Sequence, residues 1–178
     1  MQRRLIIVII LLLLIIIPLA YYLVSPLFRV VEVHEPSPFN DMLDKMDSKT
    51  LSTFNKAVAA MNNNISPMNE QMPRSVRVLR QGSFISRAHD VEGKALLIEK
   101  DGEKIIRFED FMTINGPDLH IRLSSDLGGN DYIDLGKIKA TKGNANYELP
   151  AGVDITIYNN VLVWCEPFSV LFSYARLS

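Results

Sequence analysis

The sequence lacks a second cysteine, and it lacks an excess of charge of either sign. Its single cysteine, Cys165, excludes an internal disulfide, so the folded state must depend on a hydrophobic core. There are 19 lysine and arginine residues against 20 aspartate and glutamate residues, which argues against a nucleic-acid partner. The length of 178 residues allows one modest domain with accessory segments.

The short motifs of several hydrolase classes are also absent. The sequence has no Gly-x-Ser-x-Gly, no His-Glu-x-x-His and no phosphate-binding loop. Asp118 and His120 could form a polar pair on one strand face, but Asp118 follows Gly116-Pro117, where an aspartate commonly caps a turn. The segment 124–131, SSDLGGND, offers oxygen ligands for Ca²⁺ without the spaced carboxylates of an EF-hand, so it is interpreted as a hairpin loop.

A long apolar segment is present at the N-terminus. Leu5 to Val24 is 20 residues without a charge, and such a helix measures about 30 Å, the thickness of the hydrocarbon core of a bilayer. Arg3 and Arg4 precede the segment, which favours an N-terminus in the cytoplasm and a C-terminal domain outside it. We therefore expect a single-pass cell-membrane protein whose first partner is the lipid bilayer.

A cleaved signal peptide is the competing interpretation of this segment. The hydrophobic region of a signal peptide is only about 7–15 residues long and is followed by small residues at the cleavage site. Cleavage after Ala20 would put Pro18 three residues before the cut. The uncleaved anchor is the interpretation we favour.

Composition divides the rest of the chain into two regions. Residues 25–73 begin as a proline-containing linker and continue with apolar residues at helical spacing, which predicts a stalk with short amphipathic helices. Residues 74–178 have the pattern of short strands separated by Gly, Asn and Pro. Asp101-Gly102 is a strong hairpin signal, because a type I′ turn needs positive φ angles. We expect an all-β antiparallel sandwich or barrel of about seven or eight short strands.

The last two strands are predicted to be central and buried. In NNVLVWC and VLFSYARL both alternating faces are apolar, with a tight turn at Glu166-Pro167 between the two strands. Cys165 shares one face with Val161 and Val163. A cysteine in such a strand packs as a small apolar side chain, but it could also be a redox centre.

Several blocks of this β region resemble, in order, the DM-thirteen domain family. They include GSFISRAHDVEGKALLIEKDG, NGPDL, YELPAGVD and VWCEPFSVLF, and together they cover about residues 82–177. The resemblance implies a small extracytoplasmic β domain with a proposed electron-transfer role. It also implies that Cys165 is the family's hallmark cysteine and that His89 matches a family histidine. His120 has no counterpart in the family, so it inherits no role.

The resemblance makes Cys165 the candidate redox residue and His89 a candidate tuner of its thiol pKa. A thiol cycle would need a second molecule, because the chain has no resolving cysteine. The neighbouring Glu166 disfavours a thiolate. Cys165 could instead be a packing residue or form a disulfide with a second chain.

No metal site is assigned from the sequence. A blue-copper site needs two histidines, a cysteine and a weak axial ligand, for which only His89, His120, Cys165 and Met112 are at hand in the domain, without the usual C-terminal ligand loop. Non-covalent haem would need His89 with Met112 or His120, since there is no Cys-x-x-Cys-His motif.

The leading hypothesis is a membrane-anchored redox or electron-transfer accessory module rather than a stand-alone enzyme. Its partner would be an extracytoplasmic redox or structural protein that the sequence does not identify. The alternative hypothesis is a structural or binding domain at the cell surface, with Cys165 as a core residue.

Overall fold

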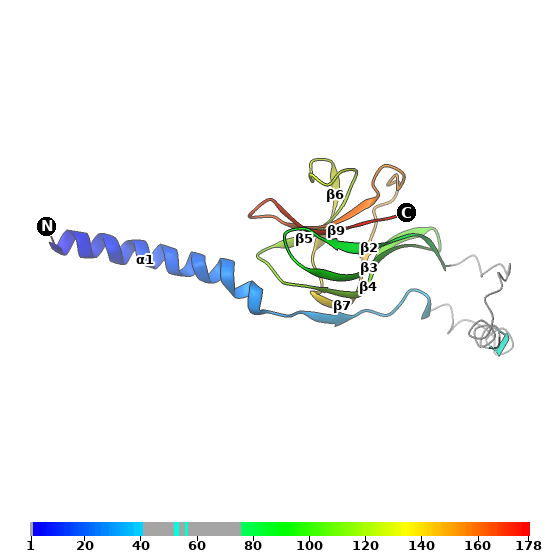
Figure 1. The fold of residues 1–178 in the computed structure, drawn as a ribbon, viewed down its shortest axis with the longest axis horizontal. Helices are drawn as coiled ribbons and strands as arrows, with labels where there is room; N and C mark the ends of the chain where they lie inside the picture. Colours follow the sequence, from blue (N-terminus) through cyan, green and yellow to red (C-terminus); the bar gives the residue numbers. More distant parts are fainter. Residues whose placement is uncertain (1, 41–51, 54–55, 57–75) are drawn as a thin grey trace.

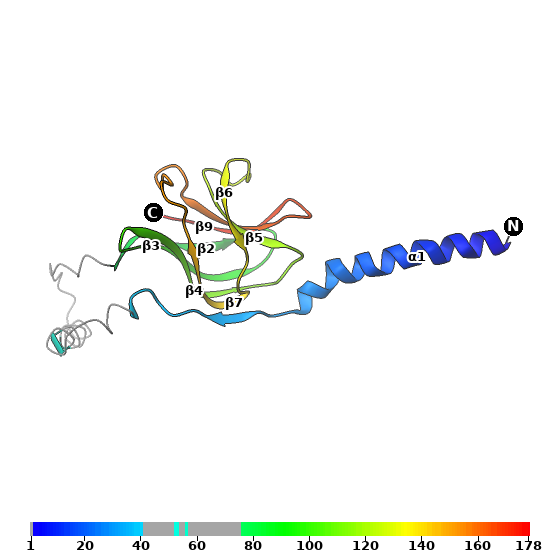
Figure 2. The same cartoon turned by 180° about the vertical axis from the view of Figure 1, so that it is seen from behind.

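The computed structural model describes residues 2–40, 52–53, 56 and 76–178. A long helix leads into a β domain, and the two are drawn in Figure 1 and, from behind, in Figure 2. The elements are α1 (Gln2–Val24), the 3-10 helix η1 (Ser25–Phe28), β1 (Glu32–His34), β2 (Val76–Ser86), β3 (Val91–Lys100), β4 (Glu103–Thr113), β5 (Leu119–Ser124), β6 (Tyr132–Lys137), β7 (Lys142–Glu148), β8 (Asn160–Cys165) and β9 (Val170–Arg176).

The strands form one strongly curled sheet. In the described region of the chain the order is β1-β7-β4-β3-β2-β9-β8-β5-β6. Strand β2 pairs with β3 along Val76–Ser83 and with β9 along Phe84–Ser86, so it joins the two halves of the curl. The all-β prediction is confirmed, and the sheet has the shape of a half-barrel with the core on its concave side (Figure 1).

Local sequence signals correspond to the observed turns and central strands. Asp101 and Gly102 connect β3 and β4 with φ angles of 52° and 90°, as a type I′ turn requires. Strand β8 lies between β5 and β9, and all of its residues are buried. Strand β9 lies between β2 and β8, so the prediction that the last two strands are central is confirmed. The prediction that both are buried holds for β8, whereas β9 is only partly buried.

A cluster of aromatic rings fills the concave side of the sheet. Phe108 lies 4.9 Å from Phe84 and from Phe111, and 5.0 Å from Tyr147, measured between ring centroids. All four side chains are buried. Burial of an aromatic side chain is among the largest single contributions to a core of this size.

The beginning of the predicted linker is attached to the domain. Residues 31–39, called the strap here, run along the outside of β7 and β4 and add β1 to the sheet edge, parallel to β7. Phe39 at the end of the strap packs against Val76, Leu96 and Ile98. The linker was predicted to be extended, but its first four residues form η1, and residues 32–34 are incorporated into the sheet as the edge strand β1. The predicted helices of residues 39–61 lie largely outside the described residues.

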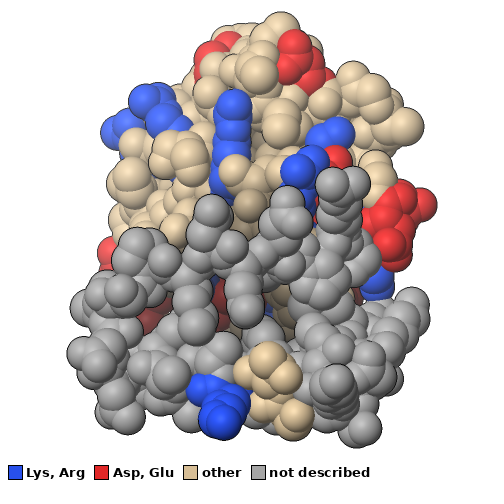
Figure 3. Space-filling view, turned by 90° about the vertical axis from the view of Figure 1, so that its right-hand side faces the viewer, with Lys and Arg blue, Asp and Glu red and all other residues tan. Residues whose placement is uncertain are grey.

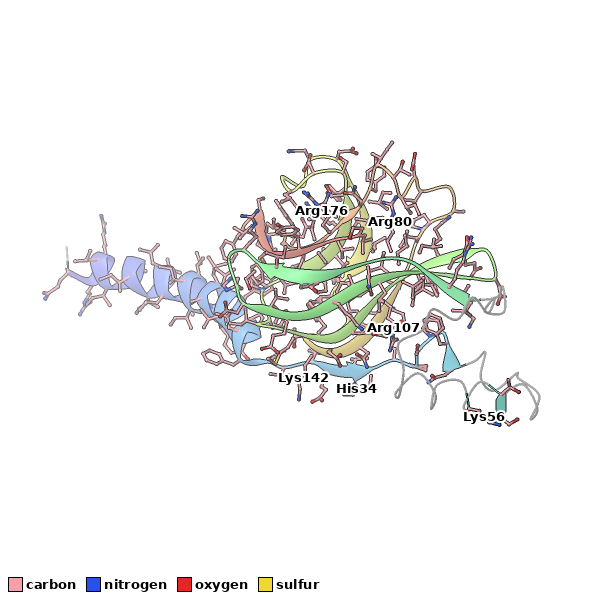
Figure 4. The ribbon with its side chains drawn as sticks, turned by 45° about the vertical axis from the view of Figure 1, so that its right-hand side comes forward. His34, Lys56, Arg80, Arg107, Lys142 and Arg176 are labelled. Atoms are coloured by element: carbon pink, nitrogen blue, oxygen red, sulfur yellow. The ribbon has the colours of Figure 1, made fainter. Side chains whose placement is uncertain are left out.

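Arg107 fastens the strap to the sheet (Figure 4). Its Nη1 donates to the Glu35 and Pro36 carbonyl oxygens at 3.3 and 3.2 Å and to Asn146 Oδ1 at 2.9 Å. Its Nε donates to Glu109 Oε1 at 3.0 Å. Because the guanidinium is buried, these acceptors replace the water it loses on folding.

Glu109→Gln should reduce the loss of stability in acid. Burial acts to raise the pKa of Glu109, but hydrogen bonds from Arg107 and Lys94 outweigh it and hold that pKa below its usual value. A lowered carboxyl pKa stabilises the fold above the unfolded-state value, and this stability is lost as the pH falls through the folded-state value. Between about pH 5 and pH 3, the free energy of unfolding should fall by about 1 kcal/mol less in the variant than in the wild type, as measured by thermal unfolding.

Glu92→Gln is the control, since Glu92 is exposed on the neighbouring strand. The same acid sensitivity in wild type and Glu109→Gln would contradict the assignment.

Candidate functional site

Cys165 ends β8 and points into the core. It lies opposite Leu119 on β5 and Val170 on β9, and its side chain is 0% exposed. The thiol donates a hydrogen bond to the Pro117 carbonyl oxygen at 3.3 Å. The alternation of β8 explains this direction, because Val161 and Val163 belong to the same core cluster.

The surroundings of Cys165 stabilise the protonated thiol. Burial raises the pKa of the Cys165 thiol, a backbone hydrogen bond from Phe168 opposes the rise, and the negative charges of Asp118 and Glu166 add to it. A thiolate is the nucleophilic form of cysteine. In this conformation Cys165 is therefore both enclosed and in its less reactive form.

His89 contacts Phe172 on β9. Its imidazole packs on Phe172, with ring centroids 4.0 Å apart, and its backbone N–H donates to the Phe172 carbonyl oxygen at 3.3 Å. The charged groups that act on the Cys165 pKa are Asp118 and Glu166. The structure thus places His89 and Cys165 near the same end of β9, with the histidine in contact with Phe172.

Asp118 and His120 belong to a polar cluster on the outer face of the sheet. His120 Nδ1 is 2.9 Å from Asp134 Oδ2, and its Nε2 is 3.5 Å from Asp118 Oδ1. Lys137 Nζ is 2.6 Å from Asp118 Oδ1. The hydrogen bond from Lys137 lowers the pKa of Asp118, and the same contact raises the pKa of Lys137. The predicted pair on one strand face is therefore included in a surface ion-pair network.

Arg122 has the environment of a functional residue, although no sequence motif singled it out. It is 5% exposed, and its guanidinium carbon lies 3.8 Å from the centre of the Tyr132 ring and 4.8 Å from that of Trp164. Its Nη2 donates to Glu166 Oε1 at 2.6 Å. The stacking on two aromatic rings and the charge-assisted hydrogen bond hold the Arg122 guanidinium in one position, as a rigid group. Strand alternation in the sequence could have indicated its outward direction, because Arg122 lies between Ile121 and Leu123, which both point into the core.

The candidate copper and haem ligands are not brought together. His120 points outward to two aspartates, whereas Cys165 points into the core of the same sheet. Met112 is exposed on β4, and His89 lies against Phe172. Among the residues described, no group of three or more His, Cys, Asp or Glu side chains is placed to hold a metal ion.

The SSDLGGND segment forms a compact loop between β5 and β6. Asp126 Oδ1 accepts from the Gly129 backbone N–H at 2.8 Å, and Ser125 Oγ donates to Asp131 Oδ2 at 2.8 Å. The Tyr158 hydroxyl donates a hydrogen bond to Asp131 Oδ1 at 2.9 Å. The carboxylates of the loop therefore accept hydrogen bonds from the loop itself and from Tyr158.

Comparison with known proteins gives one match. The family model described as electron transfer DM13 matches residues 83–177, just over half of the chain. This range contains β3 to β9, Cys165, His89 and Arg122, and it excludes α1 and the strap. No curated protein and no solved structure matches the chain.

Proposed function

The chain belongs to the electron transfer DM13 family, and from that membership we propose that it is a redox or electron-transfer accessory module. In this proposal α1 anchors the module in the cell membrane and the β domain lies outside the cytoplasm. The family match over nearly the whole β domain is the observation that carries the redox role. The partner would be a protein outside the cytoplasm that exchanges electrons with the module.

The properties of α1 support the anchoring role. Its segment has a mean hydropathy of 3.1 and none of it is buried against the protein. An apolar helix without a protein partner needs an apolar solvent, which a bilayer supplies. A signal sequence can also form an apolar N-terminal helix, so the proposal includes retention of α1 in the mature protein.

Cys165 is the proposed centre, and its chemistry is thiol–disulfide exchange with a partner disulfide. The Cys165 thiolate, having given its proton to water, attacks one sulfur of the partner disulfide. A bond forms between the two sulfurs, and the second partner sulfur leaves as a thiolate and takes up a proton. A dithiol of a second protein then attacks the Cys165 sulfur and releases the partner as a dithiol, because this chain has one cysteine. The other thiol of that protein displaces Cys165 as a thiol and closes a disulfide, so two electrons pass from the dithiol to the partner.

Local opening of the β8–β9 hairpin would expose the thiol. Ser169 in the turn has a φ of 50°, which costs free energy for a non-glycine residue. Ser173 Oγ is buried on β9 and has no hydrogen-bond partner among the residues that the structure describes. Both features lower the stability of the closed hairpin relative to the rest of the sheet, and low local stability is what regional opening requires.

A second candidate function is favoured by the enclosure of Cys165. At 0% exposure the thiol is a small apolar core residue, and the domain would then serve as a structural or binding module. The two functions differ in whether the sulfur is reached without global unfolding.

Native-state alkylation distinguishes the two functions. The full chain in detergent should react with a small maleimide at least about 100-fold more slowly than unfolded chain, because the thiol must first be exposed. The opening free energy obtained from the two rates is compared with the free energy of global unfolding. An opening free energy clearly below the global value supports thiol exchange, and equal values would overturn it in favour of packing.

Charge variants in the same assay separate the two proposed influences on the thiol. Asp118→Asn removes a negative charge that raises the Cys165 pKa and keeps a side chain that tolerates the φ of 54° at this position. His89→Gln tests the tuner role. An altered alkylation rate in His89→Gln would support that role, and an unchanged rate with faster reaction of Asp118→Asn would assign the influence to Asp118 alone.

A further inference from the structure

The connection between α1 and the β domain is short and hydrogen-bonded. Six residues separate Val24 from Val31, and four of them form η1. Asn115 Nδ2 donates a hydrogen bond to the Arg29 carbonyl oxygen at 3.1 Å. The Val31 backbone N–H donates to Thr141 Oγ1 at 2.9 Å, and the Thr141 backbone N–H donates to the Val31 carbonyl oxygen, also at 2.9 Å. With a rise of about 2 Å per residue in a 3-10 helix, the domain begins within about 15 Å of the end of α1.

The same end of the domain carries the turn beyond Cys165. Figures 1 and 2 show the β8–β9 turn and the β4–β5 connection at the end of the domain from which α1 emerges. The headgroup region on each side of a bilayer is about 5–8 Å thick. A domain held this closely reaches that region.

Exposed apolar side chains gather at this end. Phe28 in η1 is 83% exposed, and Phe168 in the β8–β9 turn is 54% exposed. Ile114 on the β4–β5 connection is also exposed. The exposed Arg29 follows Phe28 directly and supplies positive charge there, whereas Lys137 is ion-paired with Asp118 at 2.6 Å. The opposite end of the molecule, which faces the viewer in Figure 3, shows acidic and basic side chains among uncharged ones where it is described.

We propose that the end of the domain with Phe28, Ile114 and Phe168 rests in the lipid headgroup layer of the bilayer that α1 spans. These three residues are called the membrane-facing end. Aromatic side chains favour this layer, and basic side chains beside them pair with lipid phosphates. The occupant is the bilayer because the chain itself brings it there through α1. This inference rests on the anchoring role in the proposed function, and it adds a fixed orientation in which the Cys165 end of β8 faces the membrane.

Quenching by brominated lipids tests the orientation. The full chain is placed in lipid nanodiscs with one tryptophan introduced at a time, each in a Trp164→Phe background. Phe168→Trp reports the membrane-facing end, Leu12→Trp reports the inserted helix, and Ile157→Trp is the matched control. Ile157 is 53% exposed, nearly the same as Phe168, and lies in the β7–β8 connection.

The proposal predicts about twofold quenching of Phe168→Trp by lipids brominated near the headgroup, with little quenching of Ile157→Trp. Equal emission from these two variants, with Leu12→Trp quenched, would overturn the docking and leave the anchor in place. An unquenched Leu12→Trp would overturn both. A blue shift of Phe168→Trp that is insensitive to bromine would identify a second copy as the occupant and also overturn the proposal.

A second series keeps Trp164 in every variant, in case its replacement weakens the fold. Trp164 then contributes equally to the two spectra, and the difference between Phe168→Trp and Ile157→Trp is the measured quantity. Far-ultraviolet circular dichroism during heating confirms that each variant is folded. The expected difference and the overturning result are the same as in the first series.

Discussion

Arg122→Ala is expected to destabilise the domain by about 3–5 kcal/mol. The substitution removes a buried guanidinium stacked on Tyr132 and Trp164 and leaves Glu166 without the partner that lies 2.6 Å away. Breaking one side of a largely buried ion pair costs far more than the pair itself contributes. Thermal and denaturant unfolding of the full chain in detergent measures the loss.

Arg77→Ala is the matched control for Arg122. Arg77 Nη2 also lies 2.6 Å from a carboxylate, that of Glu99, but its side chain is 65% exposed. Exposed pairs contribute at most about 1 kcal/mol. Similar losses in the two variants would show that the environment of Arg122 does not strengthen its interactions, and the rigid-group assignment would be wrong.

Gly143→Ala should cost about 3 kcal/mol and release the strap. Gly143 has a φ of 107°, which favours glycine, and an added Cβ would overlap the Val33 carbonyl oxygen of β1. The added Cβ avoids this overlap only if β1 leaves the edge of β7. This movement also removes the contacts of Glu35 and Pro36 with Arg107. Cleavage after Glu32, in β1, by a glutamate-specific protease reports the release, and thermal unfolding reports the stability.

Gly136→Ala separates the backbone cost from the overlap. Gly136 has a φ of 98°, but an added Cβ would meet nothing within 4 Å. This variant should lose only about 1–2 kcal/mol and keep the bond after Glu32 protected. Equal protease sensitivity in the two variants would mean that the contact between Gly143 and Val33 does not hold the strap.

Local chemistry explains which features of the fold were predictable. The Asp101-Gly102 turn follows from the φ angles that these residues tolerate, and the burial of β8 follows from apolar residues on both of its faces. These signals act between neighbours in sequence. Alternation along β8 predicted that Cys165 shares a face with Val161 and Val163, but because both faces of the strand are apolar, it did not predict that this face points into the core.

Contacts between distant segments were not predictable. The pairing of Val33 with Gly143 joins residues far apart in sequence, and a three-residue strand carries no pattern that names its partner. Arg122 meets Glu166 and Trp164 only after β5 and β8 pair. The relation of His89 to Cys165 depends on the closure of β9 against β2, so no distance between them could be predicted.

The parallel pairing of β1 with β7 has a mechanical consequence. Three residue pairs, Glu32–Lys142, Val33–Gly143 and His34–Asn144, connect the chain leaving α1 to the sheet. Tension applied to α1 away from the domain would load these hydrogen bonds along the strand, so they would have to yield together instead of one after another. The strap therefore couples a force on α1 to the whole β domain, and the force at which this coupling fails depends on how fast the paired strands separate under load.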